Sequence, residues 1–319
     1  MDPFIAAPFI KEIGRGVKGA RSLSRSDAHD LFAAMLAGRV SDLEMGAILL
    51  SMRIKGESVD EITGFLQAAE SSFEFINAPD SIYAPIVIPT YNGARRAANL
   101  TPLLAFLLAR AGAPVLVHGV QTDAGRVTTA EILGAMNVLP SSSVAQAERD
   151  LAEVASHSRP VFVPIEILAP RLEKLLALRK ILGLRNSTHT LVKIMQPFKQ
   201  PALRLTSYTH PEYLSMLSEY FVSVVAQERG DVFLMRGTEG ETVASIKKVQ
   251  QIDWFHAGQK QVLVEAQIGT DLDLGIAPDA QGTAEWIRRV LDGEKPVPDN
   301  IAQQVEHCLS VAKRMKQVA

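Results

Sequence analysis

The chain has 319 residues, of which 47% are hydrophobic and 21% charged, and its formal net charge is −2. This composition excludes an intrinsically disordered chain, and the length suits two domains, or one large α/β domain with a helical partner. The charge excludes a protein that is basic overall, although it is compatible with a local basic patch that binds phosphate.

The content of cysteine and of apolar runs narrows the class of protein further. The single cysteine, Cys308, excludes an intramolecular disulfide and a cysteine-rich zinc site, and it fits a reducing compartment. The apolar part of the N-terminus is too short for a signal peptide, and no apolar run approaches the roughly 20 residues that cross a membrane. We therefore expect a soluble, cytoplasmic protein with no membrane partner.

Capped helices are predicted in the first part of the chain. Each begins at a serine whose side chain can accept a backbone N–H, and two of these serines have a glutamate three residues later, as in a capping box. Apolar residues at helical spacing predict a small bundle or an interface. The predicted helices run from Ser24 to Gly38, from Ser41 to Gly56 and from Ser58 to about Ser71.

From about Ala84 the pattern changes to short apolar runs that alternate with helical segments. This alternation predicts a largely parallel sheet that is covered by helices on both faces. The predicted strands are 85–89, 114–118, 161–164, 203–207 and 232–236, with helices over 100–111 and 212–226. Residues 165–195 are predicted to be a helical excursion, 243–281 to be less regular with room for antiparallel strands, 286–291 to start a helix, and 299–317 to form the terminal helix.

Several segments, in order, resemble the anthranilate phosphoribosyltransferase family. VIPTYNGARRAANLTP lies where that family carries GTGGDxxxTxNIST, LGLRNSTHTL lies where it has LGxRTxFNxL, and SYTHPEY resembles its VYHPEL. The resemblance implies an α/β fold of the nucleoside phosphorylase/phosphoribosyltransferase type, with a small helical domain and a large α/β domain. It also implies a homodimer formed by the N-terminal helices. The expected bounds are 1–82 with 165–195 for the helical domain and 83–164 with 196–319 for the α/β domain.

The departures from this family motif affect its phosphate site. In the family, a Gly-rich loop holds pyrophosphate because glycines let backbone N–H groups approach the oxygens. Here proline removes a donor, and Tyr91 and Asn92 carry side chains where the ligand would press. The family's metal-binding Asp-Glu pair falls at Glu241-Thr242, which keeps one carboxylate. We therefore expect no catalytic residue, no metal and no cofactor. The vestigial phosphoribosyl site comprises Thr90, Tyr91, Asn92, Gly93, Asn99, His118 and Gly119.

Basic residues accompany these changes, both at the altered loop and in the Gly-rich stretch GRGVKGARSLSR. The sequence is similar to a paralogue group of the family that has the altered YNGARxxANLTP loop, and this group is non-enzymatic, dimeric and binds nucleic acid. The resemblance therefore implies binding of DNA, possibly single-stranded, or of RNA, largely without sequence preference, through phosphate contacts around one cleft. The candidate binding residues are Lys11, Arg15, Lys18, Arg21, Arg95, Arg96, Arg126, Arg185 and Lys193.

Simpler interpretations apply to the same residues. Surface arginines are often only solvated, and His118 is more typical of a hydrogen-bonded structural histidine than of a catalytic one. Glu239 and Glu241 favour a solvated acidic turn over a cation site. Tyr91 either stacks on a base or fills the former sugar site. The alternative function is a divergent phosphoribosyltransferase with an unknown substrate, and a third is a regulatory scaffold without a ligand of its own.

Overall fold

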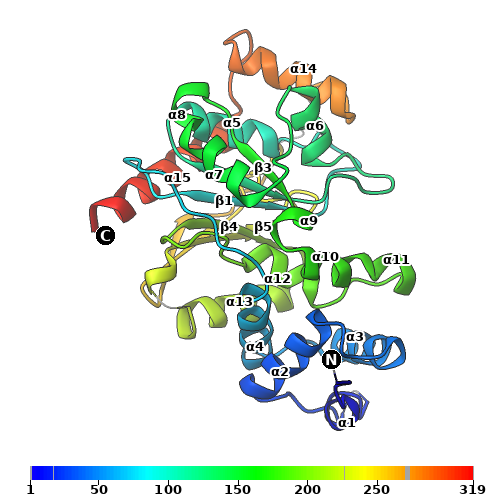
Figure 1. Cartoon of the computed structure of the whole chain (residues 1–319). Helices are drawn as coiled ribbons and strands as arrows, with labels where there is room; N and C mark the ends of the chain where they lie inside the picture. Colours follow the sequence, from blue (N-terminus) through cyan, green and yellow to red (C-terminus); the bar gives the residue numbers. More distant parts are fainter. Residues whose placement is uncertain (1, 17, 226, 270–273, 319) are drawn as a thin grey trace. The chain divides into compact units, whose positions relative to one another are not determined.

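The computed structural model describes residues 2–16, 18–225, 227–269 and 274–318 (Figure 1). The chain divides into a helical unit, 1–74 with 168–195, and an α/β unit, 75–167 with 196–319. The sequence-based bounds placed 75–82 and 165–167 in the helical part. The structure places them in the α/β unit, because the N–H of Ile76 donates to the carbonyl of Pro197 at 2.9 Å and residue 165 directly follows a strand of the sheet.

The helical unit is built around two helices that pack closely, α2 and α4. The rings of Phe32 and Phe65 stack at 4.9 Å between centroids. Gly64 allows this approach, since a Cβ there would lie 2.3 Å from the carbonyl oxygen of Arg25. The predicted serine caps at the N-termini of α2, α3 and α4 are confirmed, with full capping boxes on α3 and α4. The helices are α1 (Ala7–Ile13), α2 (Arg25–Leu36), α3 (Asp42–Lys55), α4 (Val59–Glu70), α10 (Pro170–Ala177), α11 (Arg179–Leu182) and α12 (Thr188–Ile194).

The described residues of the α/β unit form a seven-stranded sheet in the order β3-β2-β1-β4-β5-β6-β7. The strands from β3 to β5 are parallel, as predicted. The last two pair antiparallel within the region that was expected to be less regular. The strands are β1 (Ile86–Thr90), β2 (Val115–Gly119), β3 (Val161–Pro164), β4 (Leu203–Tyr208), β5 (Val232–Arg236), β6 (Ile252–His256) and β7 (Gln259–Val264).

Helices cover both faces of this sheet, with α5 and α15 on one face and α13 on the other (Figure 1). Within the described residues, no helix is long and apolar enough to cross a membrane. The helices are α5 (Thr101–Arg110), α6 (Thr129–Ala135), α7 (Val144–Ala152), α8 (Val154–His157), α9 (Ile165–Leu168), α13 (Pro211–Ser223), the 3-10 turn η1 (Gln227–Arg229), α14 (Ala280–Leu291) and α15 (Asp299–Val318).

Two parts of the chain differ from the helices predicted for the α/β unit. Helix α14 begins at Ala280, six residues before the predicted start at Trp286, because the Asp279 carboxylate caps it by accepting the N–H of Gly282 at 2.7 Å. Helices α6, α7 and α8 lie between β2 and β3, where no helix was predicted. They are short, so their apolar period extends over too few residues to be recognised.

Candidate functional site

Two loops meet where β1 and β2 end, at the carboxyl edge of the parallel sheet. The loop after β1 pairs with the loop after β2, since Ala94 and Val127 exchange backbone hydrogen bonds of 2.9 and 2.8 Å. Gly93 is needed at this junction because its φ is +64° and a Cβ would lie 2.8 Å from the Val127 carbonyl oxygen. Loops at this edge of an open α/β sheet are the usual place for a ligand site.

The first part of the loop binds a buried carboxylate of its own chain. Oε1 of Glu241 accepts the backbone N–H of Asn92 at 2.8 Å and that of Gly93 at 2.6 Å. The side chain of Asn92 completes this contact by donating to the carbonyl of Gly240 at 2.7 Å. Glu241 is only 1% exposed, so the expected solvated acidic turn is wrong for this residue.

The second part of the loop binds another carboxylate from the same turn. Oε2 of Glu239 accepts the N–H of Arg95 at 2.8 Å, and Oε1 accepts those of Arg96 and Ala97, both at 2.8 Å. Five backbone N–H groups of the described loop therefore converge on two carboxylates. Although proline removes one donor from the loop, the amides of the residues that follow it remain available as donors to carboxylates.

A buried aromatic pair lies beneath the loop. The Tyr91 hydroxyl and Nδ1 of His118 are 2.7 Å apart, and the side chains are 4% and 1% exposed. Burial, with the negative charges of Glu166 and Glu241, raises the pKa of Tyr91 well above its usual range. Burial lowers the pKa of His118 to about 3. A neutral imidazole and a protonated phenol therefore share this bond, which makes His118 structural and excludes base stacking on the Tyr91 ring in this conformation.

The other residues of the vestigial site form a buried polar network below the loop. The hydroxyls of Thr90 and Thr129 are 2.7 Å apart, and the Asn99 amide donates to Thr129 Oγ1 at 3.0 Å. Asn99 Oδ1 also accepts the N–H of Thr101, at the start of α5. Gly119 allows β1 and β2 to approach here, since a Cβ would lie 1.8 Å from the Thr90 carbonyl oxygen. This network fixes where the loop leaves the sheet.

The candidate arginines of the α/β unit all lie on these two loops. The side chains of Arg95 and Arg96 are exposed, directly beside the amides that hold Glu239. Arg126 is half-buried, and its guanidinium donates to the Gly93 carbonyl at 3.2 Å. Arg126 therefore braces the loop, whereas Arg95 and Arg96 present positive charge to solvent.

A second group of candidate residues lies in the helical unit, around His189. Burial, followed by the positive charges of Arg185, Arg179 and Lys193, lowers the pKa of His189 to about 3. Arg185 and Lys193, two of the candidate binding residues, therefore lie close enough to this histidine to act on it electrostatically. That these residues share one cleft with the arginines of the α/β unit stays a prediction.

The N-terminal basic run is exposed but is not composed only of independent cations. Lys11, Arg15, Lys18 and Arg21 all have exposed side chains. Arg15 forms an ion pair with Glu12 at 2.6 Å, which offsets one of these positive charges.

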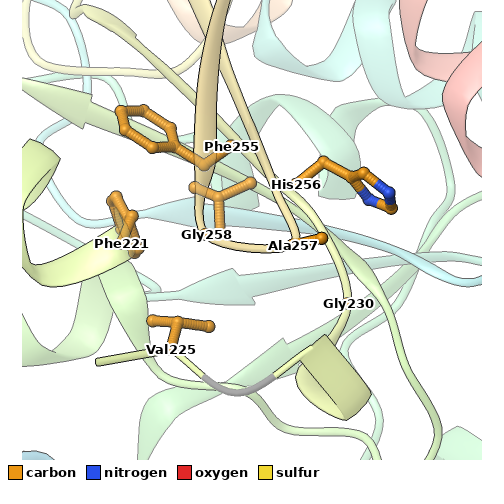
Figure 2. A pocket seen from close by; sticks show the side chains of 8 residues that line it. Phe221, Val225, Gly230, Phe255, His256, Ala257 and Gly258 are labelled. Atoms are coloured by element: carbon orange, nitrogen blue, oxygen red, sulfur yellow. The ribbon is translucent and has the colours of Figure 1, made fainter. Parts of the chain in front are cut away.

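Another group of polar residues lies at the β6–β7 hairpin. Asp231 accepts the indole N–H of Trp254 and contacts Nδ1 of His256, both at 2.8 Å. Figure 2 shows the adjacent pocket, where Phe221 and Phe255 gather and the His256 ring points away from them. The pocket holds about 10 Å³, which is room for one water molecule at most. This group is therefore structural rather than a ligand site.

The described residues contain no group of three His, Cys, Asp or Glu side chains placed to hold a metal ion. The contacts of Glu239 and Glu241 with the loop after β1 were not predicted from the sequence. The sequence feature that could have indicated these contacts is the acidic pair around Gly240, which follows shortly after β5. The carboxyl end of β5 lies at the same edge of the sheet as that of β1.

This arrangement of a helical unit and a mixed α/β unit is the fold of anthranilate phosphoribosyltransferases. The enzyme from Thermus thermophilus superposes with a TM-score of 0.72 at 18% identity, over 97% of this chain and 89% of that one. The enzyme from Saccharomyces cerevisiae, in complex with PRPP and Mg, gives 0.73 at 14% identity, over 98% and 88%. Residues 7–72 match the helical bundle domain of the glycosyl transferase family.

Sequence comparisons identify the group within this fold. Anthranilate phosphoribosyltransferase 2 of Ralstonia nicotianae is 27% identical over 91% of this chain and 83% of its own length. The uncharacterized protein YbiB of Escherichia coli strain K12 is 44% identical over 94% of this chain and 92% of its own length. The chain therefore belongs to the YbiB group of the anthranilate phosphoribosyltransferase-like family.

Proposed function

We propose that this protein binds nucleic acid through sequence-independent phosphate contacts and does not transfer a phosphoribosyl group. One observation carries the proposal. The backbone amides of the loop after β1 are engaged by Glu239 and Glu241, while the side chains of Arg95 and Arg96 on the same loop are exposed. The backbone amides, which form the inner surface of the loop, are therefore already engaged by carboxylates. The exposed side chains of Arg95 and Arg96, which form its outer surface, are positively charged.

Electrostatics argue against pyrophosphate in the inner position. A pyrophosphate that approached the amides of Asn92 and Gly93 would meet the buried carboxylate of Glu241, which already accepts both. Like charges at such short range repel strongly in a poorly hydrated site. If pyrophosphate displaced the Glu241 carboxylate from these amides, the carboxylate would stay buried without its hydrogen-bond donors, which is also unfavourable.

The outer surface has the properties that binding to a phosphate backbone needs. An arginine guanidinium can donate two parallel hydrogen bonds to a phosphate, and Arg95 and Arg96 follow one another on an exposed loop. Phosphate contacts carry no base information, so we expect DNA and RNA of any sequence to bind, and single strands as well as duplexes. The basic residues of the helical unit, Arg185 and Lys193, are proposed as additional phosphate contacts.

A divergent phosphoribosyltransferase is the second candidate, and one observation favours it. The loop keeps an array of backbone donors, so a substrate that displaces Glu239 would find amides that suit phosphate oxygens. Release of pyrophosphate from phosphoribosyl pyrophosphate in the presence of Mg²⁺ and an acceptor would establish this function.

We further propose that the protein acts as a homodimer, in the cytoplasm. Helix α3 exposes Leu43, Leu50 and Ile54, with exposed fractions of 85%, 46% and 59%. Their spacing of seven and four residues places them on one side of the helix, where a second copy would bury them. The buried thiol of Cys308 suits a reducing compartment.

Fluorescence anisotropy with labelled single- and double-stranded DNA of several unrelated sequences tests the main proposal. We expect the wild-type protein to bind all of them with similar affinity, and charge reversal in R95E/R96E to weaken each by about tenfold or more. The matched control is K313E/K316E, which reverses two exposed charges on α15. This part of α15 lies near the amino end of β1, away from the loop, because the carbonyl of Ala312 accepts the N–H of Ala84. Equal loss in both variants would contradict a specific role for the loop.

A further inference from the structure

A groove of about 420 Å³ lies within the α/β unit, apart from the loop after β1. It is lined by residues 246–249, which follow the acidic turn, by 267–269, which follow β7, by Leu274, and by 296–300, which lead into α15. Its volume lies within the roughly 300–1,000 Å³ that is usual for small-molecule sites. None of the described residues that line it belongs to the loop after β1 or to the polar network beneath that loop.

Hydrogen bonds and a close backbone approach join the three walls of the groove. The N–H of Gln267, in the second wall, donates to the carbonyl of Val249, in the first, at 3.1 Å. A Cβ at Gly269 would lie 1.9 Å from a carbonyl oxygen of the first wall. The side-chain amide of Asn300, in the third wall, donates to the carbonyl of Ser245 at 2.7 Å. The groove is therefore preformed, and a ligand would bind without the entropic cost of ordering its walls.

Most of the residues that line the groove are apolar. Ile246 and Val249 are half-buried in the first wall, and Leu274 and Val297 are half-buried as well. Ile268, in the second wall, is fully exposed. An apolar chain that entered the groove would remove surface of these side chains from water, so the hydrophobic effect favours a ligand with an apolar part.

The charged residues of the groove favour a ligand with a negative end. Lys247 and Lys248 both line the groove, and their side chains are exposed. Among the described residues that line it, Asp299 is the only acidic one, and it lies in the first turn of α15, where the helix dipole offsets a negative charge. Two cations therefore face one carboxylate that is already stabilised, and the charge of the groove complements an anion.

We propose that this groove binds a small amphipathic carboxylate, with an alkyl chain against the apolar walls and the carboxylate at Lys247 and Lys248. The apolar residues are distributed over all three walls, so a chain that bends between them contacts more of them than a flat ring. A phosphate alone would use the lysines and leave the apolar walls in water, whereas a neutral alkyl compound would use the walls and leave the lysines solvated. The inference goes beyond nucleic-acid binding and does not depend on it.

Methyl NMR of the full chain, labelled at isoleucine, tests the site with decanoate as the probe, kept below its micelle concentration. The signals of Ile246 and Ile268 should shift saturably. Those of Ile5 and Ile82, which are exposed elsewhere on the chain, should not shift. Absence of saturable shifts at Ile246 and Ile268 would overturn the proposal. Equal shifts at all four residues would show general adsorption to apolar surface and would overturn it as well.

The chain and the charge of the probe are then varied separately. From hexanoate to octanoate, and from octanoate to decanoate, the affinity should rise by about tenfold at each step, because two further methylenes leave water. Decanol has the same chain without the charge, and it should bind about threefold more weakly than decanoate, because exposed ion pairs contribute little each. Affinities that do not depend on chain length, or equal binding of decanol and decanoate, would overturn the proposal.

Variants assign the charge and the apolar contact to particular residues. K247Q/K248Q should remove the preference for decanoate over decanol, whereas K313Q/K316Q, the matched control at the other end of α15, should keep it. Ile268→Ser shortens a fully exposed side chain, so the fold stays intact, and it should weaken both probes by about threefold. An undiminished preference in K247Q/K248Q, or an unchanged affinity in Ile268→Ser, would overturn the assignment of the site to this groove.

Single-stranded DNA is the competing occupant, since the two lysines alone would attract its phosphates. An oligonucleotide that displaces decanoate from Ile246 and Ile268 would assign the groove to nucleic acid and overturn the proposal. Simultaneous binding of the oligonucleotide and decanoate supports a separate carboxylate site. If decanoate binds while no oligonucleotide does, the proposed function fails and the carboxylate site remains.

Discussion

Replacement of Glu241 by alanine should destabilise the α/β unit, because it leaves two buried backbone donors without their acceptor. The N–H groups of Asn92 and Gly93 donate to this carboxylate at 2.8 and 2.6 Å, and both residues are buried. An unsatisfied buried donor costs about 1–3 kcal/mol, so the loss of two should lower the free energy of unfolding by about 2–6 kcal/mol. This is a large share of the roughly 5–15 kcal/mol that stabilises a typical domain.

Urea unfolding followed by tryptophan fluorescence measures this loss in the relevant unit. The chain has two tryptophans, Trp254 and Trp286, and both lie buried in the α/β unit. With a slope of roughly 2 kcal/mol per M, the midpoint should fall by about 1–3 M. Glu241→Gln keeps an acceptor oxygen and should lose less. A midpoint for Glu241→Ala within about 0.3 M of the wild type would refute the reasoning.

Three further predictions follow from the same contacts. The pKa of His118 is about 3 in the folded chain and about 6.5 when unfolded, so the stability it contributes is present above pH 6.5 and is lost as the pH falls toward 3. Between these pH values the free energy of unfolding should fall by about 1.4 kcal/mol per pH unit, and H118Q should lack this fall when urea unfolding is measured at several pH values. An equal dependence of the free energy of unfolding on pH in H118Q and the wild type would count against a neutral buried histidine. Arg126→Met should remove the bond to the Gly93 carbonyl, cost about 1 kcal/mol, and speed hydrogen exchange of the loop amides, whereas unchanged exchange would show that the guanidinium does not brace the loop. L50E/I54E should convert a dimer to a monomer in light scattering, and a dimer that survives both charges would place the interface elsewhere.

Much of the fold follows from local patterns in the sequence. The serine caps at Ser41 and Ser58 need only neighbouring residues to be recognised, and the structure has them where they were predicted. The buried strand predicted over 85–89 is equally local, and the structure places it one residue later, at Ile86–Thr90. The altered loop motif also indicated where the phosphate site of the family would lie.

The content of the site depends on contacts between distant parts of the chain. Asn92 and Glu241 are 149 residues apart in sequence, and Arg96 and Glu239 are 143 apart. They meet because β4 lies between β1 and β5, so the turn after β5 reaches the loop after β1 at the same edge. Local periodicity does not contain this strand order, and for that reason the acidic turn looked solvated in the sequence.

The structure changes the physical account of how the loop relates to phosphate. From the sequence, proline was expected to remove one backbone donor of the loop, and basic side chains near the loop were expected to bind phosphate. In the structure the amides remain and hold Glu239 and Glu241, and the exposed guanidinium groups of Arg95 and Arg96 add to them. The carboxylates of Glu239 and Glu241 occupy the amides that an external anion would use. The loop therefore keeps its backbone donors, but these donors are already engaged.

The salt dependence of binding tests the central claim most directly. Affinity for single-stranded DNA, measured by anisotropy at several salt concentrations, should fall linearly on a log–log plot. Each phosphate contact contributes about 0.7 to the slope for single strands, so R95A/R96A should have a slope smaller by about 1.4 than the wild type. A wild-type affinity that does not change with salt, or equal slopes for the two proteins, would contradict the account.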